Sequence, residues 1–326
     1  MSYKVGELID GRYTVVGVVG KGGYGTVYAA IDDMLGSKVA IKLLTSDIGA
    51  DPAFKVRMLR EARAMGALSG TSAAQIFAFN KSDRGELYIV MELLAGRDLE
   101  AYLDERAQHG ARPDLKRIVS LLGPIAETLE AAHELGLIHR DVKPANIFVL
   151  DNMTRGGVRL LDFGLAKDLN ATALTAEGMI AGSPGYIAPE VWRGKAKQAD
   201  RRIDVYSLAA VVFRAIAGVP AFDPKMPLDK FLIAVTRGER PSLCALRPEL
   251  PRAVDGWVEK ALAANPDDRF PTVMQMWKSL RQIAEMPASK AQGVATVTAP
   301  WEIEVDVELD EEVAASMRGQ DLANKA

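Results

Sequence analysis

The sequence predicts an α+β fold in two parts, a smaller part built mainly from strands and a larger part built mainly from helices. Stretches rich in β-branched residues, separated by short turns, dominate the chain before residue 92. From Pro113 to Leu137 apolar residues recur at three- and four-residue steps, which indicates a long amphipathic helix. A second, mostly apolar helix begins at Asp204 and would form the core of the larger part.

Composition limits the classes of function. The chain has 326 residues, of which 48% are apolar and 25% charged, as in ordinary globular proteins of about two domains. A net charge of −3 argues against nucleic-acid binding, and a single cysteine excludes an internal disulfide and favours a reducing compartment. There is no apolar signal run and no stretch of roughly 18–20 apolar residues. We therefore expect a cytoplasmic enzyme without a membrane span.

A glycine-rich segment, Gly20–Val27, follows a predicted strand at Tyr13–Val19. Its GxGxxG spacing alone also occurs in dinucleotide-binding folds, where a helix follows the glycines. Here the next residues, 26–30, have strand character instead. Strand, glycines, strand predicts a hairpin whose backbone N–H groups can close over phosphates, with an ordinary glycine-rich hairpin as the alternative.

The segment Ile138–Asn146 has the sequence IHRDVKPAN, in which three side chains suit phosphoryl transfer. The Asp141 carboxylate can accept the proton of an attacking hydroxyl, and the Asn146 amide oxygen can ligate Mg²⁺. Lys143 places a cation where a migrating phosphoryl group carries its charge. A second carboxylate able to hold metal follows at Asp162.

Taken together, the motifs of this chain resemble those of the eukaryotic-type (Hanks-type) serine/threonine protein kinase family, in the style of a soluble bacterial member. The resemblance implies a two-lobed protein-kinase-like fold, with a small, mainly antiparallel β lobe that carries one key helix. It also implies a larger, mainly α-helical lobe and an ATP site in the cleft between the lobes. In chain order the motifs are Gly20–Val27, Lys42, Glu61, Met91–Gly96, Asp141–Asn146, Asp162–Gly164, Ala188–Glu190 and Arg269.

The same resemblance divides the chain into domains. A kinase domain is expected over residues 10–285, with an N-lobe at 10–91, a hinge at 92–96 and a C-lobe at 97–285. Residues 286–326 are expected to form an acidic, flexible tail.

The ATP site implied by the resemblance begins with Lys42, which would reach the α- and β-phosphates. Its expected partner is Glu61, on a helix predicted at Ala53–Leu68, although a surface pair of Glu61 with a neighbouring arginine is the alternative. Backbone groups of Glu92 and Leu94 would bond adenine. The expected nucleotide-binding residues are Val19, Gly20, Lys21, Gly22, Gly23, Tyr24, Gly25, Thr26, Val27, Ala40, Lys42, Met91, Glu92, Leu94, Asp98 and Phe148.

The resemblance also implies contacts with the ribose and with the metal. Asp98 would bond the ribose hydroxyls, although a helix N-cap accounts for it equally well. Mg²⁺ would be held by Asn146 and Asp162, with the family's two-metal arrangement implied. The catalytic machinery would then be completed by Lys42, Glu61, Asp141 and Lys143.

The resemblance also assigns structural roles. His139 would pack against Phe163, with Met65 and Phe77 completing an apolar stack. Asp204 is expected to tether the backbone of the catalytic loop, and His133 to be a packed core histidine. A buried ion pair is expected between Glu190 and Arg269.

A loop-like stretch rich in Thr, Ala and Gly precedes Gly182–Glu190, which resembles the segment that supports the substrate peptide. Ser183 stands where threonine is commoner and keeps a hydroxyl that could bridge Asp141 and Lys143. Thr172 and Thr175 are candidate phosphorylation sites, with ordinary loop residues as the alternative. The expected residues of this substrate platform are Gly182, Ser183, Gly185 and Tyr186.

The resemblance implies transfer of the γ-phosphoryl group of Mg-ATP to Ser or Thr of proteins, including autophosphorylation in trans, within signal transduction. A small-molecule phosphotransferase shares the acidic residues but would not need the platform. A catalytically silent pseudokinase scaffold usually lacks one of Lys42, Asp141, Asn146 or Asp162, and all four are present.

The tail alternates acidic and apolar residues over Glu302–Leu309. Its charge density favours a disordered acidic segment. Period-two alternation also permits a strand that docks on a basic surface or a sheet edge, in this protein or in a partner.

Overall fold

The computed structural model describes residues 2–22, 25–44, 65–110, 112–152, 157–163, 183–196 and 198–287. The chain forms two compact units, of which the first comprises Met1–Arg97 and Phe148–Ala166. The second comprises Asp98–Ile147 and Lys167–Ala326. Residues 148–166 therefore return to the first unit after the chain has entered the second.

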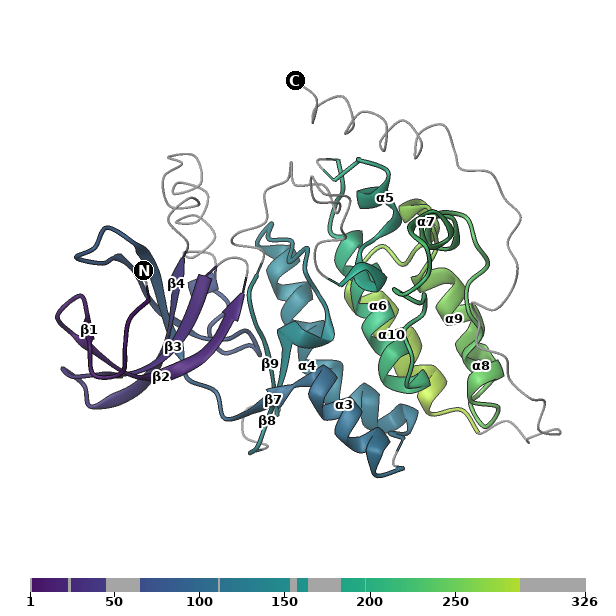
Figure 1. The fold of residues 1–326 in the computed structure, drawn as a ribbon. Coiled ribbons are helices and arrows are strands. Elements are labelled where there is room, and N and C mark those ends of the chain that lie inside the picture. Colours follow the sequence, from purple (N-terminus) through teal and green to yellow (C-terminus); the bar gives the residue numbers. More distant parts are fainter. Residues whose placement is uncertain are drawn as a thin grey trace, which may run out of the picture. The chain divides into compact units, whose positions relative to one another are not determined.

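A six-stranded sheet forms the body of the first unit (Figure 1). Its strand order is β1-β2-β3-β4-β6-β5, and each pair of neighbours is antiparallel. The strands predicted at Tyr13–Val19 and over residues 26–30 are confirmed, whereas the short first strand was not anticipated. The strands are β1 (Leu8–Ile9), β2 (Tyr13–Gly22), β3 (Gly25–Asp32), β4 (Ser37–Leu44), β5 (Ile76–Lys81) and β6 (Leu87–Glu92).

The two faces of this sheet carry different side chains because alternate residues of a strand point to opposite faces. On β4, Ile41 belongs to an apolar core on one face, whereas Ala40 and Lys42 line a cavity on the other. The N-terminal residues cover the apolar core: the backbone N–H of Tyr3 donates to the Tyr28 hydroxyl at 3.1 Å. The face of the sheet opposite the apolar core is thus the one that borders the cavity.

Phe77 does not occupy the position that the family resemblance gave it. Its surface is 53% exposed, so it does not contribute to an apolar stack. The register of β5 against β6 passes from Ile76–Met91 to Ala78–Val90, which makes Phe77 the extra residue of a β-bulge. A bulge turns one side chain out of the alternation, and Ile76 lines the cavity in its place.

A second, three-stranded sheet has the order β7-β8-β9 and consists mostly of first-unit residues. The strands are β7 (Gly96–Asp98), β8 (Ile147–Leu150) and β9 (Val158–Leu160). Gly96 has φ +143°, and a Cβ there would lie 2.1 Å from the carbonyl oxygen of Val149, so glycine alone fits this crossing. β9 leads directly to Leu161 and Asp162.

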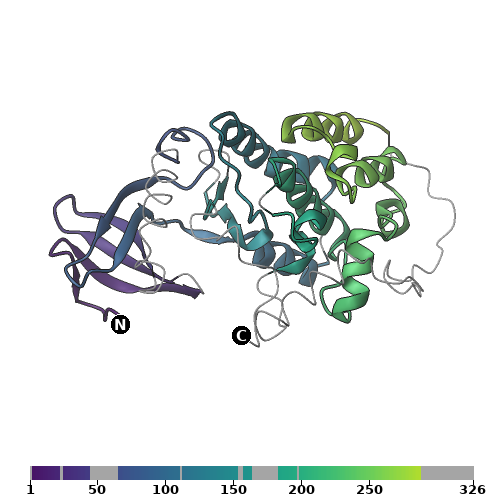
Figure 2. The ribbon, with the colours of Figure 1, turned by 90° about the horizontal axis from the view of Figure 1, so that it is seen from above.

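Helices form the second unit. In it α4, α6 and α10 lie side by side, as both views show (Figure 1, Figure 2). α6 is buried at every position from Ile203 to Ala217, which confirms the predicted core helix. The helices are α3 (Leu99–Gln108), α4 (Leu115–Glu134), α5 (Pro189–Trp192), α6 (Arg202–Ala217), α7 (Leu228–Thr236), α8 (Leu243–Leu246), α9 (Ala253–Ala261) and α10 (Val273–Ala284), with 3₁₀ turns at Pro144–Asn146, Pro184–Tyr186 and Pro266–Asp268.

Capping residues set the ends of α4 inside the predicted range. The Asp114 carboxylate accepts the N–H of Arg117 at 2.6 Å, and Gly136 follows the helix with φ +73°. This helix leads to the segment that contains Asp141. In the part of the chain that the structure describes, no helix combines the length and the apolar character needed to cross a bilayer.

Candidate active site

The glycine-rich hairpin joins β2 to β3, as the sequence predicts. Gly22 lies opposite Gly25 in the strand register, and Lys21 lies opposite Thr26. Gly25 has φ +146°, and a Cβ there would lie 1.9 Å from the carbonyl oxygen of Leu43. Only glycine therefore permits this approach of β3 to β4. Gly23 and Tyr24, at the tip, lie outside the described residues.

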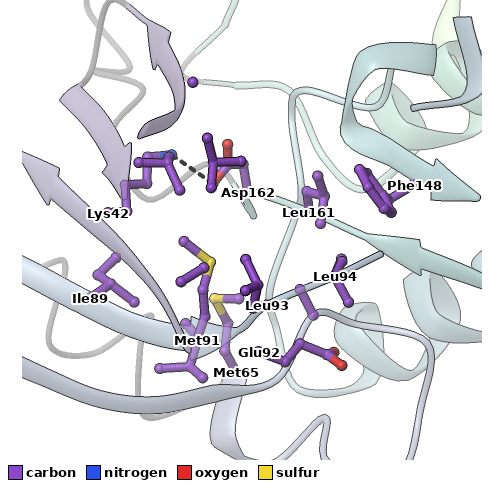
Figure 3. A pocket seen from close by; sticks show the side chains of 16 residues that line it. Lys42, Met65, Ile89, Met91, Glu92, Leu93, Leu94, Phe148, Leu161 and Asp162 are labelled. Atoms are coloured by element: carbon purple, nitrogen blue, oxygen red, sulfur yellow. Dashed lines mark hydrogen bonds and ion pairs between the residues drawn. The ribbon is translucent and has the colours of Figure 1, made fainter. Parts of the chain in front are cut away.

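A mainly apolar cavity of about 180 Å³ lies within the first unit, against the Ala40 and Lys42 face of β4 (Figure 3). Nine of the predicted nucleotide-binding residues line it, together with the predicted metal ligand Asp162: Val19, Gly20, Val27, Ala40, Lys42, Met91, Glu92, Leu94 and Phe148. An apolar slot with a cation and a carboxylate at one end suits a flat base joined to phosphates. The other lining residues are Met65, Ala74, Ile76, Ile89, Leu93 and Leu161.

Sequence reasoning missed most of this second group as pocket residues. Because every second residue of a strand faces the same side, Ile89, two residues before Met91, could have been assigned to the cavity face of β6. Leu161 directly precedes the predicted metal ligand Asp162, so adjacency alone could have suggested it. Ala74 gives no such signal, because its position depends on a parallel bridge between Ala73 and Leu160.

Lys42 forms an ion pair with Asp162 at the polar end of the cavity. Lys42 Nζ donates to Asp162 Oδ1 at 2.6 Å, across 120 residues of sequence (Figure 3). Asp162 has φ +48°, an uncommon backbone conformation for a residue other than glycine. The expected partner of Lys42, Glu61, lies outside the described residues, so that pairing stays a prediction.

Three side chains meet in the catalytic loop of the second unit. Lys143 Nζ donates to Asp141 Oδ2 at 3.0 Å, and Asn146 Nδ2 donates to the same oxygen at 3.0 Å. Asn146 Nδ2 also donates to the backbone oxygen of Asp141 at 2.8 Å. The 3₁₀ turn Pro144–Asn146 makes this contact because it brings Asn146 back toward Asp141. The carboxylate is thereby fixed in orientation beside a cation.

A buried acid holds the backbone of this loop, as predicted. Asp204 accepts the N–H groups of His139 and Arg140, each at 2.8 Å, and faces His133 Nε2 at 2.8 Å. Burial alone would raise the pKa of Asp204, but these hydrogen bonds and the nearby His133 hold that pKa below its usual value. His139 is fully buried, and its Nδ1 accepts the N–H of Asp141 at 3.2 Å, which suits a supporting role.

The described part of the predicted substrate platform is anchored to α6 and packed inward. Ser207 Oγ donates to the backbone oxygen of Tyr186 at 2.7 Å. Burial, followed by the charge of Glu100, raises the pKa of Tyr186 above its usual value. Ser183 and Gly185 belong to the same turn. The other platform residue, Gly182, and the candidate phosphorylation sites Thr172 and Thr175 lie outside the described residues.

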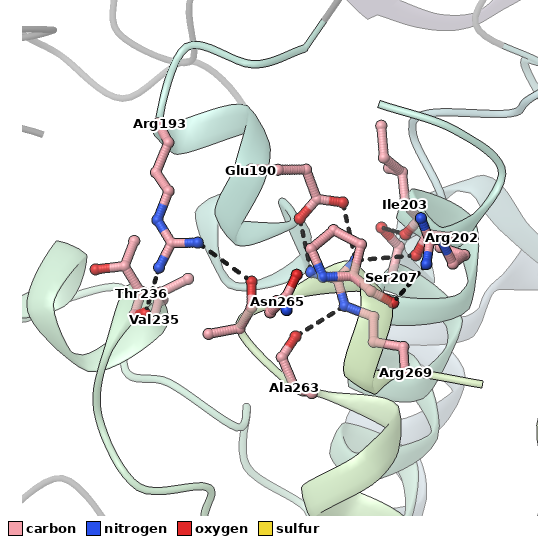
Figure 4. A network of polar contacts seen from close by, with 12 residues as sticks. Glu190, Arg193, Arg202, Ile203, Ser207, Val235, Thr236, Ala263, Asn265 and Arg269 are labelled. Atoms are coloured by element: carbon pink, nitrogen blue, oxygen red, sulfur yellow. Dashed lines mark hydrogen bonds and ion pairs between the residues drawn. The ribbon is translucent and has the colours of Figure 1, made fainter. Parts of the chain in front are cut away.

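The expected buried ion pair is present beside the platform (Figure 4). Arg269 Nη1 and Nη2 donate to the two oxygens of Glu190 at 2.8 and 2.6 Å. Arg269 also donates to the carbonyl oxygens of Ala263 and Arg202, at 2.8 and 3.1 Å. The pair joins α5 to the segment before α10 and so fixes the end of the platform.

Asp98 is an N-cap in this structure. Its Oδ1 accepts the N–H of Ala101 at 2.8 Å at the start of α3. The helix-capping interpretation is therefore confirmed, and a contact with ribose stays a prediction.

Each of the two predicted metal ligands, Asn146 and Asp162, has donor chemistry that fits Mg²⁺ when it is considered by itself. Because Asn146 Nδ2 is committed to Asp141, the amide oxygen is the atom that Asn146 can offer to a cation. Asp162 supplies a carboxylate that is partly exposed at the cavity. Carboxylate and amide oxygens are hard ligands, and Mg²⁺ commonly uses one or two of them together with phosphate oxygens.

The sequence pattern that describes the protein kinase domain matches residues 13–280. A probable serine/threonine-protein kinase PknB of Corynebacterium glutamicum is 35% identical over 87% of this chain and 44% of its own length. The serine/threonine-protein kinase PknL of Mycobacterium tuberculosis is 36% identical over 85% of this chain and 67% of its own length. The chain spans about half the length, between 43% and 50%, of the first curated relatives that it matches.

Solved structures agree with these relatives. The crystal structure of the PknI kinase domain of Mycobacterium tuberculosis superposes with a TM-score of 0.68 and 28% sequence identity. The match covers 87% of this chain and all of the PknI domain. The fold is therefore the α+β protein kinase fold.

Proposed function

Because this chain belongs to the eukaryotic-type (Hanks-type) serine/threonine protein kinase family, we propose that it transfers the γ-phosphoryl group of Mg-ATP to serine or threonine hydroxyls of proteins, itself included. The observation that carries the proposal is the arrangement around Asp141, whose carboxylate is held at one oxygen by both Lys143 and Asn146. A base that must orient a hydroxyl needs a fixed carboxylate.

The residues have distinct roles in the proposed reaction. Asp141 accepts a hydrogen bond from the Ser or Thr hydroxyl and aligns its oxygen for in-line attack on the γ-phosphorus. Lys143, already in contact with Asp141, balances the negative charge of the transferring phosphoryl group. Lys42 orients the α- and β-phosphates, while backbone groups of Glu92 and Leu94 bond the adenine edge in the apolar cavity.

Asn146 and Asp162 would hold Mg²⁺, which supplies positive charge against the β- and γ-phosphate oxygens when bound. In the structure Lys42 contacts Asp162. Since Lys42 is also assigned to the phosphates, it would be shared between the carboxylate and the nucleotide. The match with kinases named as serine/threonine-specific supports Ser and Thr, rather than Tyr, as acceptors.

Phosphate transfer from labelled ATP, to the protein itself and to a generic basic protein, tests the proposal. We expect label on Ser or Thr, and a kcat that falls by about 10²–10⁴ in Asp141→Asn. The control Asp83→Asn, an exposed acid in the turn between β5 and β6, leaves transfer unchanged. Mass spectrometry of the product then shows whether Thr172 or Thr175 carries phosphate.

Two outcomes would overturn the proposal. Nucleotide binding without transfer to any protein, even after phosphorylation by an upstream kinase, would favour a scaffold. Label on a small alcohol but on no protein would favour a small-molecule phosphotransferase.

A further inference from the structure

An ion pair that the proposed reaction does not use lies behind the adenine end of the cavity. Arg159 Nε donates to Glu92 Oε1 at 3.2 Å, and only 4% of the Arg159 side chain and 18% of the Glu92 side chain are exposed. Both residues belong to the first unit. Charged side chains are seldom this buried without a specific partner, so the pair is a built feature of the fold.

Glu92 is tied to its neighbours through both backbone and side chain. Its N–H donates to the carbonyl oxygen of Gln75 at 2.9 Å, and its Oε1 accepts the N–H of Gln75 at 2.8 Å. Arg159 therefore binds an oxygen that already holds the segment before β5. In Figure 3 the Glu92 carboxylate lies on the side of Leu93 and Leu94, away from the Lys42–Asp162 ion pair.

Arg159 in turn lies on β9, the strand that leads to Asp162. Its successor Leu160 donates to the carbonyl oxygen of Ser72 at 2.7 Å and accepts the N–H of Ala74 at 2.9 Å. Two residues further along the chain, Asp162 contacts Lys42 at the polar end of the cavity. The Arg159–Glu92 pair thus connects the segment that would bond adenine with the strand that presents Asp162.

We infer that Arg159 is a positioning residue for ATP: its ion pair with Glu92 sets the spacing between the adenine-bonding segment and the Asp162 carboxylate. The inference rests on the proposed function, because it assumes that ATP occupies the cavity with adenine at Glu92 and phosphates at Lys42. ATP must contact the adenine-bonding segment and Lys42 at the same time, whereas adenosine contacts the adenine-bonding segment alone. Loss of the Arg159–Glu92 pair therefore weakens the binding of ATP more than the binding of adenosine.

The test measures dissociation constants for Mg-ATP and for adenosine in Arg159→Met and Glu92→Gln. The first change removes the charge and keeps the aliphatic stem, and the second keeps the acceptor for the Gln75 N–H. We expect the preference for Mg-ATP over adenosine to fall about tenfold to a hundredfold in each variant. The KM for ATP rises by a similar factor, and the KM for the protein substrate stays unchanged.

The double variant shows whether the two residues act as a unit. Arg159→Met/Glu92→Gln should bind Mg-ATP no more weakly than the weaker single variant. A matched control is Arg12→Met, which breaks the bidentate ion pair with Asp32 at 2.9 and 2.7 Å in the same unit. That variant should lose thermal stability and keep the wild-type preference.

Folded Arg159→Met and Glu92→Gln proteins with a preference within twofold of wild type would overturn the inference, even if both melt earlier. Because the readout is binding, failure of the proposed function is recognised separately. A wild-type chain that binds Mg-ATP without transferring phosphate leaves the ratio measurable and contradicts the kinase activity alone. A wild-type chain that binds Mg-ATP no better than adenosine overturns the positioning role.

Discussion

Removing one member of the Glu190–Arg269 pair should destabilise the second unit strongly. None of the Arg269 side chain and 8% of the Glu190 side chain is exposed, and four hydrogen bonds hold the guanidinium. Glu190→Gln leaves the buried guanidinium without its counter-charge, and Arg269→Met does the same to the carboxylate. Such changes cost about 3–5 kcal/mol, a large fraction of the roughly 5–15 kcal/mol that stabilises a domain.

Thermal unfolding followed by tryptophan fluorescence measures this loss, because Trp192, Trp257 and Trp277 are buried in the second unit. At about 2–4 °C for each kcal/mol, Tm should fall by roughly 6–20 °C in either variant. Lys116→Ala is the control, since its pair with Glu285 is 63% and 74% exposed and should contribute less than about 1 kcal/mol. A Tm within 2 °C of wild type in both buried variants would refute the reasoning.

Three further outcomes follow from other parts of the chain. The pKa of Asp204 is held low in the folded protein, so the ionised carboxylate stabilises the fold above about pH 4. That contribution is lost as the pH falls through the lowered pKa. The difference in Tm between wild type and Asp204→Asn should therefore shrink below pH 4, and a difference that stays constant would contradict this. Burial raises the pKa of the Cys244 thiol to about 11, which leaves little reactive thiolate at pH 8. Iodoacetamide at pH 8 should therefore modify the native protein at least about tenfold more slowly than the unfolded chain, as measured by mass spectrometry. Equal rates would show that the reactivity of the thiol is not lowered by the fold. Gly25→Ala forces a Cβ to within 1.9 Å of the Leu43 carbonyl oxygen and should weaken ATP binding, measured by calorimetry, about tenfold or more. The control Gly36→Ala, at φ +65° with open space around it, should leave the affinity for ATP unchanged. Equal affinities for ATP in the two variants would show that the hairpin adapts.

Local sequence determined much of the site in advance. The hairpin follows from the strand character of residues 26–30 after the glycines, and the contact of Asn146 with Asp141 joins residues only five positions apart in one loop. Spacing along a loop or strand fixes such geometry almost by itself. The ion pair of Lys42 with Asp162 differs, because it joins residues 120 positions apart and was not predicted. The family resemblance paired Lys42 with Glu61 and assigned Asp162 to the metal instead.

Other features depend on interactions that a single sequence does not reveal. Phe77 and Ile76 are adjacent and apolar, and a strand without the bulge would place either on the cavity face. The bulge alone decides between them. Likewise the N-terminal residues cover the sheet through contacts such as the hydrogen bond that the Tyr88 hydroxyl donates to Asp10 Oδ2 at 2.6 Å. The periodicity of the sequence does not predict such contacts.

The proposed base Asp141 and its partners Lys143 and Asn146 lie on one short loop, and the buried charge of Asp204, from a distant element, holds the backbone of that loop. Asp204 on α6 accepts the N–H groups of His139 and Arg140, two residues and one residue before Asp141. Since Asp204 is fully buried, its removal should lower stability and activity together. Asp141 is only partly buried, so its replacement should slow phosphate transfer strongly and leave the fold nearly intact. This difference separates the residues that perform the reaction from those that position them.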